Sequence, residues 1–279
     1  MNKEEQAYLD LMKNILDNGN KKSDRTGVGT KSIFGTRLEF DISNNKIPLL
    51  TTKRTFIRGI IEELLFFING KTQTQELMDK GINIWKGNTS REFLDSRGLT
   101  HYEVGEMGKM YGALWRDFNG VDQLKDNLQL LKNDPNSRRI MMTALDPSLL
   151  PSTVLSPCHI LYQWYVNEEK VSCQYYQRSL DYCAGVPFNL VSASVLTQIM
   201  AKAAGLKADR LIMCGGDTHI YNTHIEGATE QISRVPFEFP NLLINKELSS
   251  IEDMEKLVYN DFVLNDYNFH PPIKYEMAI

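Results

Sequence analysis

The run of residues 158–166 constrains the fold more than any other stretch, because it alternates with the period of a β-strand. Its even-numbered positions, from Cys158 to Val166, point to one side of such a strand. Its odd-numbered positions, from His159 to Tyr165, point to the other side. Both sets are largely apolar, and this favours a strand inside a sheet with both faces covered.

Further patterns predict the elements around this strand. The expected helices cover 4–18, 54–69, 75–80, 121–133, 190–204 and 220–233. The other expected strands cover 31–42, 139–144, 170–179 and 210–214, and the polar stretch 87–108 indicates surface loops. No repeat or linker divides the chain, so we expect one α+β domain over 1–279, with a large mixed β-sheet flanked by helices.

Composition narrows the class of protein. The 279 residues are 42% hydrophobic and 24% charged, with a net charge of −4, which argues against an extended nucleic-acid or membrane surface. The N-terminus is polar, and no apolar stretch approaches the length of a membrane span. The four cysteines form no CxxC pair and show no metal-ligand spacing. We therefore expect a cytoplasmic protein with reduced thiols, no metal, and no membrane or nucleic-acid partner.

Cys158 is the first of several polar groups that suit the binding and attack of an anionic ligand. Arg178, Asp181 and Asn189 follow it, and then His219 and Tyr221, which share one face of an extended segment. A nearby positive charge lowers the pKa of a thiol and so favours the reactive thiolate. A lone cysteine is more often an inert core residue, but the ordered set indicates an enzyme with a cysteine nucleophile.

Three arginines are candidates for phosphate binding. Arg25 lies in the glycine-punctuated loop 24–30, which is either a turn before a strand or a loop that grips an oxyanion. Arg138 and Arg139 are adjacent at a strand start and point to opposite faces, so they cannot easily reach one ligand in their own subunit. Reaching a site across a dimer interface removes that difficulty.

Glu63 lies in an otherwise apolar helix, where an unpaired carboxylate is costly. Its presence indicates proton chemistry or water organisation, or else a helix-edge ion pair with Arg58 or Lys53. Trp85 is most simply a core residue.

Together these segments resemble the thymidylate synthase family. The matching motifs cover nearly the whole chain, and they lie at 24–30, 50–54, 63–65, 111–112, 138–139, 156–159, 177–181, 185–189, 216–221, 270–274 and 277–279. The resemblance implies a thymidylate synthase-like fold and a symmetric homodimer with shared active sites. It also implies reductive methylation of dUMP to dTMP, with 5,10-methylenetetrahydrofolate as the co-substrate and dihydrofolate released.

The resemblance assigns roles to individual residues. The catalytic set is Cys158, Glu63, Tyr111, His159 and Asn189. The nucleotide-binding set is Arg25, Arg138, Arg139, Arg178, Ser179, Asp181, Asn189, His219 and Tyr221, with Arg138 and Arg139 supplied by the partner subunit. The folate-binding set is Lys53, Ile84, Trp85, Asp181, Gly185 and Ala278.

Within those sets, Cys158 would add to C6 of the uracil ring, and Tyr111 would assist removal of the C5 proton. Glu63 would order the water used in proton transfers, and His159 would tune that network. Asn189 would read the O4 and N3–H edge of the base.

Several positions depart from the family pattern. They are Phe56, Phe66, the loop 70–73, Lys109-Met110 and Leu145-Asp146. Because of the last two pairs, an alternative function remains, that of a dUMP hydroxymethylase of the same fold. In that reaction water quenches the methylene intermediate and tetrahydrofolate leaves. Trp85, which would screen the methylene carbon from water, favours the synthase. A protein that binds nucleotide or RNA without chemistry is a third alternative, disfavoured by the intact Cys158.

Overall fold

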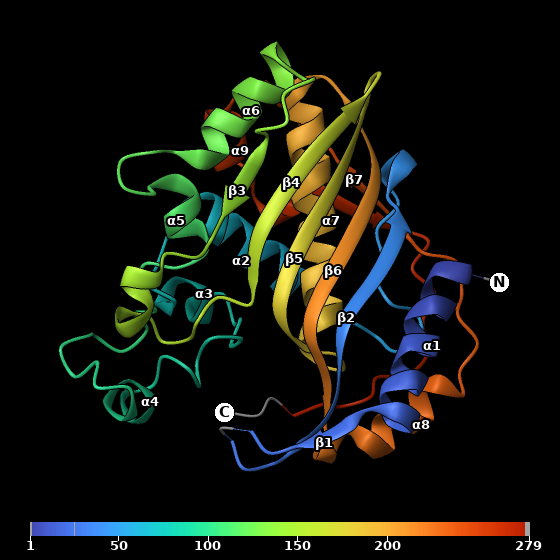
Figure 1. Ribbon diagram of the computed structural model, residues 1–279. Helices are drawn as coiled ribbons and strands as arrows, with labels where there is room; N and C mark the ends of the chain where they lie inside the picture. The colour runs from blue at the N-terminus through green and yellow to red at the C-terminus, as the bar shows by residue number, and fades with distance from the viewer. Residues whose placement is uncertain (1, 25, 277–279) are drawn as a thin grey trace.

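The computed structural model describes residues 2–24 and 26–276, and its centre is a six-stranded mixed sheet. The strand order is β1-β2-β6-β5-β4-β3 (Figure 1), and only β5 and β6 run parallel to each other. The strands are β1 (Asn20–Lys22), β2 (Thr30–Asp41), β3 (Met141–Thr143), β4 (His159–Asn167), β5 (Lys170–Asp181) and β6 (Lys207–Tyr221). A small second sheet pairs β7 (Asn241–Ile244) with β8 (Phe262–Asn265). The expected α+β class is confirmed.

Helices cover one face of the large sheet. They are α1 (Lys3–Asn18), α2 (Ile57–Ile68), α3 (Gln75–Asp79), α4 (Arg91–Ser96), α5 (Gly112–Arg116), α6 (Gln123–Asn133), α7 (Gly185–Ala204), α8 (Ile225–Ile232) and α9 (Ile251–Glu255). Short 3₁₀ turns occupy Ser43–Asn45, Pro147–Ser152, Asn222–His224 and Tyr259–Asp261. None of the helices in the described ranges combines the length and apolarity that a bilayer crossing requires.

Helix α7 lies behind the centre of the sheet (Figure 1) and links the parallel strands β5 and β6. Parallel neighbours need such a crossover, because a tight hairpin cannot join them. Most of the side chains on α7 are buried on all sides, and its C-cap Gly205 has a φ of 74°. Glycine takes that left-handed conformation without steric cost and so ends the helix. In this strand–helix–strand unit, the C-terminal end of β5 and the start of α7 lie next to each other at one end of the strands.

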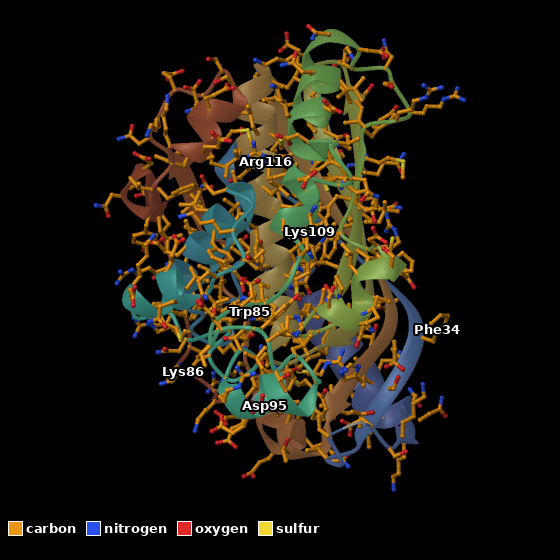
Figure 2. All side chains as sticks on the ribbon, turned by 90° about the vertical axis from the view of Figure 1, so that its left-hand side faces the viewer. Phe34, Trp85, Lys86, Asp95, Lys109 and Arg116 are labelled. Carbon is orange, nitrogen blue, oxygen red and sulfur yellow. The ribbon has the colours of Figure 1, made fainter. Side chains whose placement is uncertain are left out.

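The opposite face of the sheet is not covered by the described chain, so the expectation of two covered faces is wrong for a single chain. Tyr165 on β4 is 64% exposed, Met141 on β3 is 44% exposed, and Tyr176 on β5 is 36% exposed. Figure 2 shows Phe34, which is 81% exposed, projecting outward from β2 and away from the helices. Large apolar side chains exposed together on a flat face are typical of an interaction surface.

Three expected elements differ from the structure. Strand β6 extends to Tyr221 rather than ending at 214, because β2 pairs with it along its length, with Thr30 opposite Tyr221. The helix expected at 220–233 therefore shortens to Asn222–His224 and α8. The stretch expected as loops at 87–108 contains α4, whose Phe93 and Leu94 are buried. A helix of six residues is too short to show a clear hydrophobic period.

Candidate active site

The site is built around the loop that enters β4. The backbone N–H of Cys158 donates to the Tyr111 hydroxyl at 2.9 Å, and the carbonyl of Cys158 accepts from the Arg178 N–H at 2.8 Å. The Arg178 side chain also holds this loop, with Nε donating to the Pro157 carbonyl and Nη2 to the Ser156 carbonyl, both at 2.7 Å. These bonds fix the position of the thiol from both sides.

The thiol of Cys158 is held in the protonated form in this structure. Burial raises the pKa of Cys158, and the positive charge of Arg178 offsets only part of that effect. Arg178 lowers the pKa of the thiol, as expected, but burial outweighs that effect, so the pKa of Cys158 does not fall toward neutrality. Arg178 is placed to stabilise the thiolate once it forms.

Tyr111 links the thiol loop to the aromatic core. Its φ of 45° is unusual for a residue with a side chain, and the next residue, Gly112, begins α5. A Cβ at Gly112 would collide with the backbone of Phe67 on α2, so glycine permits the close approach of the two helices. The Tyr111 ring stacks on His159 with centroids 4.3 Å apart and lies against Phe67 at 5.2 Å.

Glu63 on α2 is buried without a charged partner in the described chain. Its Oε1 accepts from the Trp85 indole N–H at 2.7 Å, so the ion pairs considered with Arg58 or Lys53 do not form. The adjacent Glu62 does form an ion pair, with Lys80 at 2.6 Å. Burial raises the pKa of Glu63 to about 7, against the opposing effect of the Trp85 hydrogen bond. A group with that pKa can both give and take a proton near neutral pH.

His159 is neutral in this cluster. Burial lowers the pKa of His159 to about 3. Its Nδ1 lies 3.0 Å from the hydroxyl of Tyr162, a residue that the sequence reasoning placed only in the strand.

Asn189 lies in the first turns of α7 and faces the end of β5. Its Oδ1 accepts from Nε2 of Gln177 at 3.0 Å, and the same nitrogen donates to the Ser179 carbonyl at 3.1 Å. Gln177 is opposite His159 in the ladder between β4 and β5. It therefore connects the side-chain amide of Asn189 to the start of β4, next to Cys158. The sequence reasoning missed this role, although the position of Gln177 in the motif 177–181 was visible. A Cβ at Gly185 would lie 3.8 Å from Oδ1 of Asn189, an ordinary van der Waals contact, so the space beside the amide does not itself require glycine.

His219 and Tyr221 lie together on β6, as expected from their spacing of two. Their rings pack edge-to-face with centroids 5.2 Å apart. His219 Nδ1 lies 3.2 Å from Asp217, and in the ladder His219 is opposite Asp181 on β5. This pairing places the His/Tyr pair beside the end of β5, where Ser179 is half-buried.

Two of the expected folate-binding residues lie close to the start of α7. Asp181 Oδ1 accepts from the Ala184 N–H at 3.1 Å and is 3.7 Å from Nδ1 of His224. Lys53 is buried, with Nζ donating to the Cys183 carbonyl at 2.8 Å, and burial lowers the pKa of Lys53 to about 8. In this conformation the lysine holds the chain beside Asp181 rather than reaching outward, as a contact with a folate tail would require.

The remaining expected residues fall into three groups. Ile84 is partly buried beside Trp85, which lies in the middle of the view in Figure 2. Arg138 and Arg139 are exposed before β3, far from the thiol. Met141 is opposite Gln163 in the ladder, so Arg139 lies near the level of Tyr165, about 23 Å along β4 from Cys158 at roughly 3.3 Å per residue. Arg25 and Ala278 lie outside the described residues.

No group of three or more histidine, cysteine or carboxylate side chains in the described ranges is arranged to hold a metal ion.

The fold and site define a single-domain α+β protein with a partly buried thiol beside a buried carboxyl and a buried imidazole at one end of its sheet. The sequence matches the family model described as thymidylate synthase over residues 6–279. The chain belongs to the thymidylate synthase family.

Curated relatives agree with this assignment. The chain is 47% identical to a bifunctional dihydrofolate reductase-thymidylate synthase of Leishmania amazonensis, with 100% of the chain and 56% of the relative covered. It is 44% identical to a probable thymidylate synthase of Schizosaccharomyces pombe, covering 100% of the chain and 48% of the relative. With a thymidylate synthase of Candida albicans the identity is 42%, covering 100% of the chain and 98% of the relative. The chain thus spans about half the length of the first two.

The raised pKa of Glu63 predicts how stability changes with pH. Below pH 4.5 the carboxyl is protonated in both states, and above about pH 7 it is charged in both. Between these values the native state binds more protons, so its contribution to stability falls as the pH rises. Glutamine does not titrate, so Glu63→Gln does not lose this contribution as the pH rises. We expect the free energy of unfolding of the variant, minus that of wild type, to increase by about 3 kcal/mol from low to high pH.

Urea unfolding at several pH values measures this change. Glu62→Gln is the matched control, because its carboxylate has Lys80 as a partner. It should show no such shift in favour of the variant. A difference between Glu63→Gln and wild type that stays flat across this pH range would contradict the assignment.

Proposed function

We propose that the protein is a thymidylate synthase whose catalytic domain is residues 1–279. It converts dUMP to dTMP with 5,10-methylenetetrahydrofolate and releases dihydrofolate. One observation carries the proposal: the partly buried Cys158 is bonded through its backbone N–H to the buried Tyr111, and close to them Glu63 has a pKa of about 7. Nucleophile and proton-transfer groups in one water-poor site are what this reaction requires.

The chain supplies the nucleophile and its activation. The sulfur of Cys158 bonds to C6 of the uracil ring, and the electron pair of the C5–C6 bond moves onto C5 and O4. Arg178 stabilises the thiolate that attacks, and its Nη1 makes no hydrogen bond in the described chain and is left for a phosphate oxygen. Asn189 presents an amide to the O4 and N3–H edge of the base, a pattern that cytosine reverses. Ser179, His219 and Tyr221 hold the sugar and phosphate.

The chain also moves a proton. Loss of the C5 proton requires an acceptor, and the Tyr111 hydroxyl and the Glu63 carboxyl are the nearby groups that can relay it through water. The folate supplies the one-carbon unit and the hydride. Asp181 offers a carboxylate to pterin N–H groups, and the flat apolar surface of Trp85 and Ile84 suits an aromatic ring, so these residues fit the co-substrate. In the proposal Gly185 and Ala278 complete that side of the site, and Lys53 joins them once its Nζ leaves the Cys183 carbonyl.

The rival hydroxymethylase depends on the unusual pairs at 109–110 and 145–146, and these have local structural roles. Lys109 forms an ion pair with Asp117 at 2.6 Å, and Met110 is fully buried. Asp146 accepts from the backbone and hydroxyl of Ser148, capping the 3₁₀ turn that follows. None of these contacts delivers water to the site, so they give the rival no support.

The active species in this proposal is a symmetric homodimer. The exposed apolar face around Tyr165 and Tyr176 supplies a surface that a second copy would cover. A two-fold interface lets each subunit lend its Arg138 and Arg139 to the site of the other. The distance of these arginines from their own Cys158 supports the exchange.

The cytoplasmic location inferred from the sequence stays a prediction. The four cysteines are free thiols, as a reducing compartment favours.

The product of the wild-type enzyme tests the proposed reaction. With dUMP and 5,10-methylenetetrahydrofolate, we expect dTMP and an equal amount of dihydrofolate, measured by mass spectrometry and absorbance. The hydride must come from the folate, so the two products are coupled. Hydroxymethyl-dUMP with tetrahydrofolate would contradict the synthase and support the rival. Failure to form any nucleotide product would favour a binding protein without chemistry.

Mixing two inactive variants tests the shared site. Arg139→Ala lacks the arginine that it should lend, and Cys158→Ala lacks the nucleophile. In a hybrid dimer, one site regains both groups, so a 1:1 mixture should recover up to about a quarter of wild-type activity. Subunit exchange is followed with two affinity tags. In a control mixture Lys13→Ala replaces Arg139→Ala, and there we expect no recovery beyond the activity that the Lys13→Ala subunits bring to the mixture. Complete exchange without recovery would contradict the shared site.

A further inference from the structure

Tyr162 and His159 lie on the same side of β4, although they are three positions apart in the sequence. Side chains three apart on a regular strand point to opposite faces. The ladder between β4 and β5 shifts register between His159 and Leu161, so Ile160 is an extra residue on β4. Such a bulge turns the preceding side chain to the other face. Both His159 and Tyr162 are therefore buried on the helix-covered side, at 5% and 1% exposure.

The contact between them is specific. The Tyr162 hydroxyl lies 3.0 Å from Nδ1 of His159, and the two rings meet edge-to-face at 82°. The hydroxyl makes no other hydrogen bond in residues 2–24 and 26–276. Burial raises the pKa of Tyr162 well above its ordinary value, so the hydroxyl keeps its proton, and the neutral His159 has one nitrogen that accepts.

These facts settle the direction of the bond. If Nδ1 carried the imidazole proton and donated to Tyr162, the hydroxyl proton would be buried without an acceptor in the described chain. An unsatisfied buried donor costs about 1–3 kcal/mol. If the hydroxyl donates to Nδ1, the buried hydroxyl proton has an acceptor, and the imidazole carries its own proton on Nε2, the nitrogen that is left for water or substrate.

We propose that Tyr162 is a positioning residue that holds His159 in its Nε2–H form, so that the imidazole is a fixed hydrogen-bond donor beside Tyr111 and Cys158. The ring cannot turn freely, because it is stacked on Tyr111 and packed against Trp115. Nε2 makes no hydrogen bond to any described residue and is left for water or substrate. The role of this donor in turnover rests on the proposed function, but the state of the imidazole does not.

Nitrogen NMR of the histidine rings tests the proton position directly. The protein with ¹⁵N-labelled histidine has five histidines, and His159→Gln identifies the signals of His159. We expect Nδ1 of wild-type His159 to show the shift of an unprotonated nitrogen and Nε2 that of a protonated one. Tyr162→Phe should reverse or mix this pattern. A protonated Nδ1 in wild type, or an unchanged pattern in Tyr162→Phe, would overturn the proposal.

Tyr175→Phe is the matched control. Its ring stacks on Tyr162 at 5.7 Å and is fully buried, but its hydroxyl has no hydrogen-bond partner in the described chain. Removal of that hydroxyl should leave the His159 signals unchanged. If Tyr175→Phe altered them as Tyr162→Phe does, the effect would be one of packing and the proposal would fail.

Activity measurements separate this proposal from the proposed function. We expect Tyr162→Phe to lower kcat about tenfold with little change in KM for the nucleotide, and to have no further effect in a His159→Gln background. An equal loss in both backgrounds would show that Tyr162 does not act through His159. If wild type makes no dTMP, the proposed function fails while the NMR result still decides the tautomer.

Discussion

The hydrogen bond from the Cys158 backbone to the Tyr111 hydroxyl is the contact on which the rest of the site depends. It joins the loop before β4, which carries the thiol, to the turn before α5, which carries the aromatic ring. The positive φ of Tyr111 aims its side chain at that loop, and Gly112 lets α5 approach α2. Strain of this kind persists only where surrounding packing fixes it. Here the stacked His159 ring and the ring of Phe67 provide that packing.

Burial governs the chemistry of this cluster more than charge does. It keeps Cys158 protonated, brings the pKa of Glu63 to about 7 and leaves His159 neutral. All three shifts favour the uncharged form of the group. Near neutral pH the thiol of Cys158 is therefore protonated and Glu63 can exchange a proton, and Arg178 is the nearby positive charge that stabilises the thiolate when it forms.

Local patterns in the sequence were enough to predict much of the fold. The helical period of α1, the glycine that ends α7 and the alternation along β4 each reflect local physics, so one sequence sufficed. The end of β6 at Tyr221 was not predictable in that way, because pairing with β2 sets it. The same holds for the bulge at Ile160, which places His159 on the buried side. The sequence motifs were enough to predict which residues make up the site. They could not predict the bond from Lys53 to Cys183 or the role of Gln177, because these depend on contacts between distant segments.

Proton exchange at C5 of dUMP tests most directly whether Cys158 is the nucleophile. Bond formation at C6 makes C5 basic, so in deuterated water without folate the enzyme should replace the C5 hydrogen with deuterium, detected by mass spectrometry. We expect exchange with wild type and with Cys214→Ala, which removes another partly exposed thiol, and none with Cys158→Ala. Exchange that persists in Cys158→Ala would contradict the account.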